Sequence, residues 1–152
     1  MNWQLKTFDE LTADELYEIL RLRSDVFVVE QNCVYPDIDG VDRRSLHLFV
    51  RDGEAVTAYL RLYPKTGEPG TVHMGRVVTR TRGVGLGGSL LRQGIRVAFA
   101  QADVREIYIE AQDHARGFYA REGFIPCSEV FLEDGIPHVQ MRLKRENRLK
   151  NC

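Results

Sequence analysis

Residues 77–91 read VVTRTRGVGLGGSLL, and this stretch decides the fold of the chain. Its first residues are β-branched and predict the end of a strand. Four of the six residues 83–88 are glycine, and the apolar residues that follow predict a helix. Glycines let a ligand approach the backbone closely, and the N-terminus of a helix carries partial positive charge. Arg82 adds a cation at the rim of the turn. The stretch therefore predicts a site for a phosphate or another anion.

The residues on either side of this stretch predict an α+β fold with a mixed sheet. The capping-box spacing of Thr12 and Glu15 predicts the start of a helix that runs to about Val28. Asp52 and Gly53 separate two β-rich runs, which is typical of a hairpin turn. Strands are expected at residues 3–8, 46–51, 55–63, 71–79, 106–110, 124–131 and 137–143. Further helices are expected from about residue 88 to residue 102 and over residues 114–121.

Length and charge exclude several classes of protein. With 152 residues, 43% of them hydrophobic, the chain can form one core, and we expect a single domain over residues 1–152. The formal net charge of −1 gives no overall field toward nucleic acid or an anionic membrane, so neither is an expected partner. No apolar run reaches the roughly 18–20 residues that span a bilayer. The first six residues also lack the pattern of a signal peptide.

The cysteines and the acidic loops argue against disulfides and against a metal site. Cys33, Cys127 and Cys152 are odd in number and far apart, which favours a reduced, cytoplasmic protein. The run Asp37–Gly40 resembles part of a calcium loop, but its glycine follows the second aspartate directly and the final glutamate is missing. The basic tail Arg142–Lys150 is interpreted as a solvated turn after the last strand, in preference to an arm that binds nucleic acid.

Two classes of ligand fit the glycine turn when it is taken alone, and a purely structural turn is a third interpretation. The spacing of Gly83, Gly85 and Gly88 matches the fingerprint of dinucleotide-binding folds, and Glu110 lies where the ribose carboxylate would be expected. Arg82, Gly85 and Gly87 instead match the pyrophosphate loop of the GNAT superfamily of acyltransferases. A dinucleotide fingerprint normally opens the first βαβ unit, whereas here about 80 residues that include a hairpin precede it. Position along the chain therefore favours the acyltransferase loop.

A second segment strengthens the resemblance to GNAT proteins. Residues 112–124, QDHARGFYAREGF, resemble the other GNAT signature, in which a short helix follows a strand and ends in Phe-Tyr-x-x-x-Gly-Phe. The two signatures occur in the expected order, with one helix and one strand between them. Residues 26–40, 75–78 and 133–138 also resemble the ElaA-type bacterial subgroup.

The resemblance implies a fold, a cosubstrate and a set of residues that bind it. It implies a mixed central sheet of about seven strands with helices on both faces, and acetyl-CoA bound where strands 71–79 and 106–110 diverge. One backbone N–H near Val77 would polarise the thioester carbonyl. The residues expected to contact coenzyme A are Val77, Val78, Thr79, Arg82, Gly83, Val84, Gly85, Leu86, Gly87, Gly88, Ser89, Gln112 and Tyr119. Tyr119 aligns with the tyrosine that often protonates the departing thiolate.

The group that takes the proton from the amine is open at this point. Glu30 and His138 are the main candidates, because relatives place the first loop and the late hairpin around the acceptor. His73 is a third candidate, and His47 is interpreted as a packing or hydrogen-bonding residue. Two acidic segments, one with Glu30, Asp37, Asp39 and Asp42 and one with Glu133 and Asp134, would favour a cationic acceptor if they converged. Solvated loops with local turns explain the same residues equally well.

The function expected from the sequence is acetyl transfer from acetyl-CoA to a primary amine, on a small cation or on a peptide or protein. No Cys–His or Ser–His arrangement is evident, which favours direct transfer in a ternary complex. The alternatives are a non-catalytic acyl-CoA sensor and a dinucleotide-binding oxidoreductase. Family habit implies a homodimer. The acceptor, the acyl-chain length and the base stay open.

Overall fold

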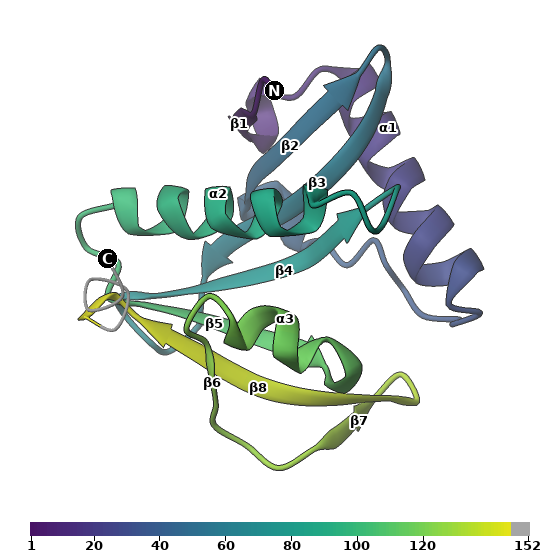
Figure 1. The fold of residues 1–152 in the computed structure, drawn as a ribbon. Helices are drawn as coiled ribbons and strands as arrows, with labels where there is room; N and C mark the ends of the chain where they lie inside the picture. The colour runs from purple at the N-terminus through teal and green to yellow at the C-terminus, as the bar shows by residue number, and fades with distance from the viewer. Residues whose placement is uncertain (147–152) are drawn as a thin grey trace. The chain divides into compact units, whose positions relative to one another are not determined.

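The computed structural model describes residues 1–146 (Figure 1). The chain divides into two compact units. Unit 1 contains Met1–Tyr63 and Arg76–Gly94, and unit 2 contains Pro64–Gly75 and the residues from Ile95 onward. Strand β4 (Thr71–Thr79) and helix α2 (Leu86–Ala100) each supply residues to both units. The expectation of a single domain over residues 1–152 stays a prediction.

Unit 1 contains an antiparallel meander followed by the second part of β4. β1 (Gln4–Thr7) pairs with β2 (Leu46–Asp52), and β2 pairs with β3 (Ala55–Pro64). The predicted hairpin between β2 and β3 is confirmed, with Gly53 at a φ of 63°.

Helices of unit 1 lie between β1 and β2 along the chain, and residues of α1 (Ala13–Arg23) and η2 (Ser24–Glu30) pack against β2 and β3. α1 begins at the predicted capping box, where the Glu15 N–H donates to Thr12 Oγ1 and the Thr12 N–H donates to Glu15 Oε1. The helix does not continue to Val28 as an α-helix; η2 forms a π-helix instead. Short 3₁₀ turns lie at Phe8–Glu10 (η1) and Val41–Arg44 (η3). The apolar core of the unit contains Ile19, Leu22, Val26, Phe49, Val56, Tyr59 and Val78.

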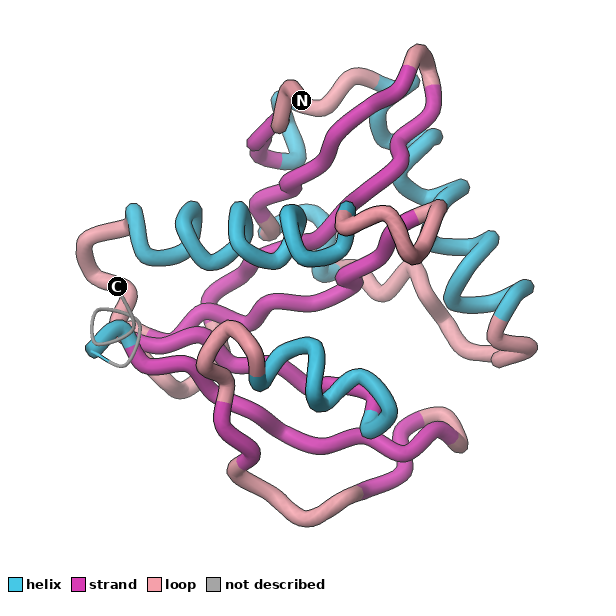
Figure 2. The backbone as a smooth tube through the Cα atoms, in the orientation of Figure 1, coloured by secondary structure: helices cyan, strands magenta, loops and turns pink. Residues whose placement is uncertain are grey.

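Unit 2 is built around β8 (Ile136–Lys144). β5 (Glu106–Gln112) pairs with β8 in antiparallel fashion along its whole length, and the first residues of β4 pair with β5 in parallel. The strands β6 (Ile125–Pro126) and β7 (Phe131–Glu133) also pair with β8. The 3₁₀ turn η4 (Asp113–Ala115) and helix α3 (Arg116–Ala120) follow β5 (Figure 2).

The predicted fold class is confirmed: the protein is a mixed α/β structure with an open multi-strand sheet and helices. The single strand expected at residues 124–131 is wrong, because only residues 125–126 and 131–133 pair with β8. Over residues 1–146, no helix is long and apolar enough to cross a membrane. The last part of the basic tail, residues 147–150, lies outside the described residues, as do residues 151–152.

Candidate functional site

The glycine turn of unit 1 joins the end of β4 to the N-terminus of α2 (Figure 2). Gly83 and Gly85 have positive φ angles of 82° and 79°, a conformation that glycine adopts without steric cost. The helix begins at Leu86, earlier than predicted, and its Ser89 N–H donates to the Gly85 carbonyl at 3.2 Å. Gly87 therefore lies in the first turn of the helix, and it does not have a positive φ.

Open space beside the two turn glycines fits a ligand better than a packing constraint. A Cβ atom added at Gly83 or Gly85 would meet no protein atom within 4 Å. At Gly88, by contrast, it would lie 3.2 Å from Arg92 Nη1. The N–H groups at the start of a helix have no carbonyl four residues earlier to bind, and they face outward with partial positive charge. The turn thus leaves room for a ligand at the N-terminus of α2.

Arg82 and Glu30 form an ion pair at this turn. Glu30 is the last residue of the π-helix, and Arg82 comes directly before Gly83. About half of each side chain is exposed to solvent. The structure thus places the first base candidate beside the cation of the glycine turn.

Replacing Glu30 with glutamine should strengthen the binding of coenzyme A about two- to fivefold. The substitution frees Arg82 for the pyrophosphate, and an exposed ion pair is worth at most about 1 kcal/mol. Isothermal titration with coenzyme A measures this change. Asp25→Asn is the matched control, because Asp25 pairs with Arg80 in the same unit and its loss should leave the affinity unchanged. A large fall in kcat with unchanged affinity would instead make Glu30 the base.

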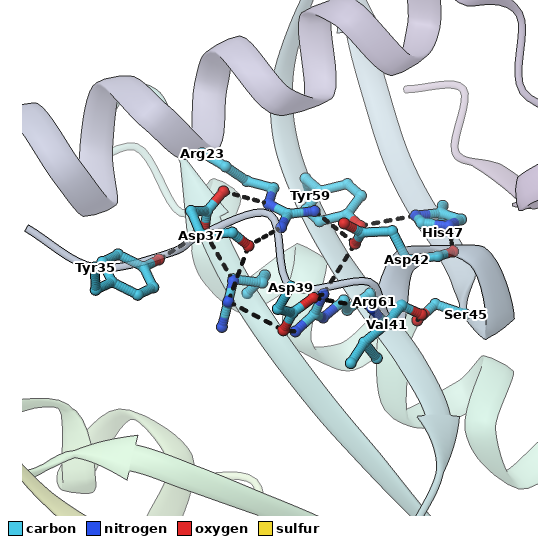
Figure 3. Close-up of polar contacts among 11 residues, drawn as sticks. Arg23, Tyr35, Asp37, Asp39, Val41, Asp42, Ser45, His47, Tyr59 and Arg61 are labelled. Atoms are coloured by element: carbon cyan, nitrogen blue, oxygen red, sulfur yellow. Dashed lines mark hydrogen bonds and ion pairs between the residues drawn. The ribbon is translucent and has the colours of Figure 1, made fainter. Parts of the chain in front are cut away.

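Three aspartates of the first loop are paired with three arginines and do not form an open acidic surface (Figure 3). The members of this arginine–aspartate network are Arg23, Arg61, Arg76, Asp37, Asp39 and Asp42. Arg23 is fully buried, and it donates to Asp37 Oδ2 at 3.0 Å and to Asp42 Oδ1 at 2.7 Å. The expected acidic segment is therefore wrong for these three aspartates, because their charges are neutralised within the unit.

The charges of the network shift the pKa values of its members. Burial alone would raise the pKa of Asp39, but hydrogen bonds from Arg61 and from the Val41 N–H lower it to about 2. Asp42 follows the same pattern, since Arg23 and Arg61 outweigh its burial and lower its pKa. Burial lowers the pKa of His47, whose Nε2–H donates to the Asp42 carbonyl and whose Nδ1 accepts from Tyr59. The prediction that His47 is a packing residue agrees with this geometry.

The strand register of unit 2 gathers polar side chains on one face of β5, β7 and β8. His138 of β8 is paired with Gln112 on the neighbouring strand β5. On the other edge of β8, it is paired with Phe131 of β7. Because alternate residues of a strand share a face, Glu110 and Glu133 lie on that face too. His138 is a sequence-predicted base, and the structure places it with Gln112, a predicted ligand of coenzyme A. We call Glu110, Glu133 and His138 the acid–imidazole group.

The acid–imidazole group is held by a chain of short contacts. Tyr108 donates its hydroxyl hydrogen to Glu110 Oε2 at 2.8 Å, and Glu110 also hydrogen-bonds Glu133. The Nδ1–H of His138 donates to the Ile136 carbonyl at 2.7 Å, which leaves Nε2 3.6 Å from Glu133 Oε2. Partial burial raises the pKa of Glu133, the Glu110 charge raises it further, and His138 opposes this shift.

The remaining predicted residues of unit 2 lie around α3 and β4. Tyr119 is buried, and its ring makes edge-on contacts with Phe118 and Phe124. Burial raises the pKa of its phenol, which strengthens its hold on its proton. His73, the third base candidate, makes an edge-on ring contact with Tyr108 at 5.0 Å.

The structure thus assigns the predicted residues to two groups. Unit 1 brings Glu30, Arg82 and the glycine turn together, with Val77–Thr79 on the adjoining strand. Unit 2 brings Gln112 together with His138, and it adds Glu110 and Glu133. Sequence reasoning gave Glu133 only as one charge among several and Glu110 only as a dinucleotide ligand. Period-two alternation places Glu110 on the same face of its strand as Gln112, but only the pairing of β5 and β7 with β8 brings Glu110 and Glu133 to the face of His138.

Among residues 1–146, no group of three or more His, Cys, Asp or Glu side chains is arranged to hold a metal ion.

Comparison with known proteins identifies the family. The model of the acetyltransferase (GNAT) domain matches residues 11–145. The chain belongs to the GNAT family. ElaA of Escherichia coli (strain K12) is 37% identical over 145 residues, which cover 93% of this chain and 95% of that protein. A UPF0039 protein of Schizosaccharomyces pombe is 40% identical over 143 residues, with coverage of 91% and 94%. The resemblance to ElaA-type proteins is therefore confirmed.

Solved structures agree with the family. The crystal structure of an acyl-CoA N-acyltransferase from Pseudomonas aeruginosa matches with a TM-score of 0.86 and 40% identity, covering 93% of this chain and 99% of that one. The crystal structure of Escherichia coli ElaA matches with a TM-score of 0.86 and 36% identity, covering 93% and 97%.

Proposed function

We propose that the protein is an acyl-CoA N-acyltransferase that transfers an acetyl group from acetyl-CoA to a primary amine. The observation that carries this proposal is the glycine turn of a GNAT chain. Gly83 and Gly85 have positive φ with open space beside them, and they lead into the N-terminus of α2. Arg82 adds the cation that a diphosphate requires.

The roles proposed for unit 1 concern binding and polarisation of the thioester. Main-chain groups of Val77, Val78 and Thr79 pair with the pantetheine arm, and the amides of Gly83–Ser89 bind the pyrophosphate. An N–H group next to Val77 polarises the thioester carbonyl and stabilises the negative charge that develops on its oxygen. These main-chain groups transfer no proton. Their contribution to binding and catalysis therefore depends on the orientation of the backbone N–H and C=O groups.

The roles proposed for unit 2 concern protons. The ammonium form of the acceptor must lose a proton before its nitrogen can attack, and a carboxylate with a raised pKa accepts a proton well near neutral pH. Glu133 has that property, so we propose the Glu133 carboxylate as the base, with Glu110 and His138 setting its pKa. When the carbon–sulfur bond breaks, Tyr119 donates its phenolic proton to the thiolate and is reprotonated from solvent; because burial raises the pKa of this phenol, the transfer is uphill. Gln112 contacts the cosubstrate.

The acceptor we propose is a cationic primary amine, either small or at the end of a peptide. With the first loop neutralised by arginines, this proposal rests on the carboxylates of the β7–β8 hairpin, Glu133 and Asp134, together with Glu110. Direct transfer suits the site, since Cys33 is buried and no acyl-enzyme nucleophile is needed. Free thiols at Cys33 and Cys127 support a cytoplasmic location, and a homodimer stays a prediction.

Thiol release from acetyl-CoA tests this function directly. The wild-type protein should release free coenzyme A in the presence of at least one class among polyamines, amino acids, aminoglycosides and peptide N-termini. Binding of coenzyme A without turnover on the whole panel would indicate a sensor. Stabilisation by NAD(H) and not by coenzyme A would indicate an oxidoreductase.

Replacing Gly85 with valine should weaken the binding of coenzyme A at least about tenfold while the fold persists. A β-branched residue is strained at a φ of 79°, and its side chain fills the open space that the pyrophosphate needs. Isothermal titration gives the affinity, and circular dichroism gives the fold. Gly53→Val is the matched control, because Gly53 also has positive φ with open space but lies in the β2–β3 hairpin. Unchanged affinity in a folded Gly85→Val protein would remove the turn from the site.

A further inference from the structure

Arg76 has a backbone conformation that arginine rarely adopts. Three non-glycine residues of the described chain have positive φ: Asn32, Arg76 and Asp134. Asn and Asp tolerate this conformation because their short side chains bond to the local backbone, whereas a long, unbranched side chain gains nothing locally. Arg76 has a φ of 52° inside strand β4, and the preceding residue is Gly75, which does not have positive φ. The strained backbone conformation therefore falls on Arg76, although the adjacent Gly75 could adopt a positive φ without strain.

The side chain of Arg76 explains why the backbone stays in this conformation. Its Nε lies 2.8 Å from Asp37 Oδ1, and its Nη2 lies 3.1 Å from the Asp37 carbonyl oxygen and 3.3 Å from Asp39 Oδ2. The guanidinium also lies over the Tyr35 ring, 5.4 Å from its centroid. The segment from Tyr35 to Asp39 thus holds Arg76 through an ion pair, hydrogen bonds and an aromatic face.

The partners of Arg76 are themselves fixed. Asp37 is bound by the fully buried Arg23, and it accepts a hydrogen bond from the Tyr35 hydroxyl at 2.6 Å. Asp39 is bound by Arg61, whose Nη2 lies 2.6 Å from Oδ2. A strained backbone persists only where the surroundings over-determine it, and such positions concentrate at functional sites. The arginine–aspartate network supplies that constraint at Arg76.

The position of the strain gives it a function. Arg76 directly precedes Val77, Val78 and Thr79, the residues whose main-chain groups are proposed to meet the thioester and the pantetheine arm. A left-handed residue in a strand re-aims the peptide groups that follow it. We propose that Arg76 is a positioning residue, whose anchored side chain keeps the β4 backbone bent so that the main-chain N–H near Val77 points at the thioester carbonyl. This inference rests on the proposed acyl transfer.

Two substitutions of Arg76 separate backbone conformation from side-chain packing. Arg76→Ala removes the ion pairs and leaves a residue for which positive φ is strained, so the bend should relax. Arg76→Gly removes the same ion pairs, but glycine adopts positive φ freely. We expect kcat per folded molecule to fall about tenfold in Arg76→Ala and only about threefold in Arg76→Gly, because the Val77 N–H acts in the transition state. The Kd of coenzyme A should change less than kcat in both, since the amides of the glycine turn that bind the pyrophosphate are unchanged, although the pantetheine arm pairs with the affected strand.

Arg80→Ala is the matched control. It deletes another arginine of unit 1 that pairs with an aspartate, Asp25, at 3.3 Å, and Arg80 has no positive φ. Its kcat should equal that of the wild type within about twofold. A merely structural role of Arg76 would lower stability and leave kcat unchanged, so the split between kcat and Kd is the decisive readout.

Each outcome supports or overturns the inference. Wild-type kcat in both folded Arg76 variants, or a lower kcat in Arg76→Gly than in Arg76→Ala, overturns it. If Arg76→Ala does not fold, Arg76→Gly decides alone: a reduced kcat with a smaller change in Kd supports the inference, and a full kcat overturns it. A wild-type protein that releases no thiol with any amine overturns the proposed function together with this role of Arg76.

Discussion

Replacing Arg23 with methionine should lower the free energy of unfolding by about 3–5 kcal/mol. Methionine has a similar length, so the loss comes from charge and not from a large cavity. The substitution leaves Asp37 and Asp42, both nearly buried, with fewer cations around them, and an incompletely paired buried carboxylate is costly. Urea denaturation followed by circular dichroism measures the change, and the melting temperature should fall by about 10 °C.

The Arg80→Ala protein is again the comparison for this measurement. In the wild type, the ion pair between Arg80 and Asp25 is partly exposed, and such pairs contribute at most about 1 kcal/mol to the free energy of unfolding. If Arg23→Met lowers the free energy of unfolding no more than Arg80→Ala does, the arginine–aspartate network does not stabilise the fold.

The pKa shifts of the network also set the direction of the pH dependence of stability. The pKa of Asp39 is lowered from 3.8 to about 2, and that of Asp42 is lowered as well. A carboxyl group with a lowered pKa contributes stability above its ordinary pKa and loses it as the pH falls toward the folded value. The wild type should therefore lose stability between about pH 4 and pH 2, and Arg23→Met, which already lacks part of this stabilisation, should lose less over the same interval.

Local signals in the sequence predicted much of the fold. The capping box at Thr12 involves residues three apart, and the Asp52–Gly53 turn involves neighbours, so both can be recognised without the fold. The glycine turn was found for the same reason. Its helix start was misplaced by two residues because glycines 87 and 88 look unhelical, yet they lie in the first turn of α2. Glycine has a low helix propensity, but in the first turn of a helix it also leaves the backbone N–H groups open to a bound anion. The low propensity of these two glycines therefore did not prevent helix formation.

The arginine–aspartate network could not be predicted in this way. Arg23 and Asp42 are 19 residues apart, and Arg76 and Asp39 are 37 apart, so nothing local pairs them. In the sequence alone, the aspartates of the first loop are typical of a solvated acidic loop. Only the fold shows that arginines from distant segments pair with them. The strained backbone of Arg76 is equally invisible, because it arises from contacts between distant segments. The acid–imidazole group is intermediate between the local signals and the long-range network. The alternation of side chains along a strand predicts which residues share a face, but it does not predict which strands pair.

Replacing Glu133 with glutamine should lower kcat by about 10²–10³-fold, the range expected for loss of a general base. Glutamine keeps the shape of the side chain but cannot take a proton. The affinity for acetyl-CoA should be unchanged, because Glu133 is not among the residues proposed to bind the cosubstrate. A carboxyl group with a raised pKa favours its protonated form in the fold, and this stabilisation is lost as the pH rises through the folded pKa. At neutral pH the glutamine variant should therefore melt no lower than the wild type.

The pH–rate profile distinguishes Glu133 from His138 as the base. In the wild type, the acidic limb of kcat/KM should lie above pH 4.5, the ordinary value for glutamate, because burial and the Glu110 charge raise the pKa of Glu133. Glu110→Gln removes one of the causes that raise this pKa, so the limb should move to lower pH. His138→Gln removes the imidazole that opposes the shift, so the limb should move to higher pH while most of kcat is kept. Loss of the limb in His138→Gln, with the limb retained in Glu133→Gln, would make His138 the base and reduce Glu133 to its electrostatic partner.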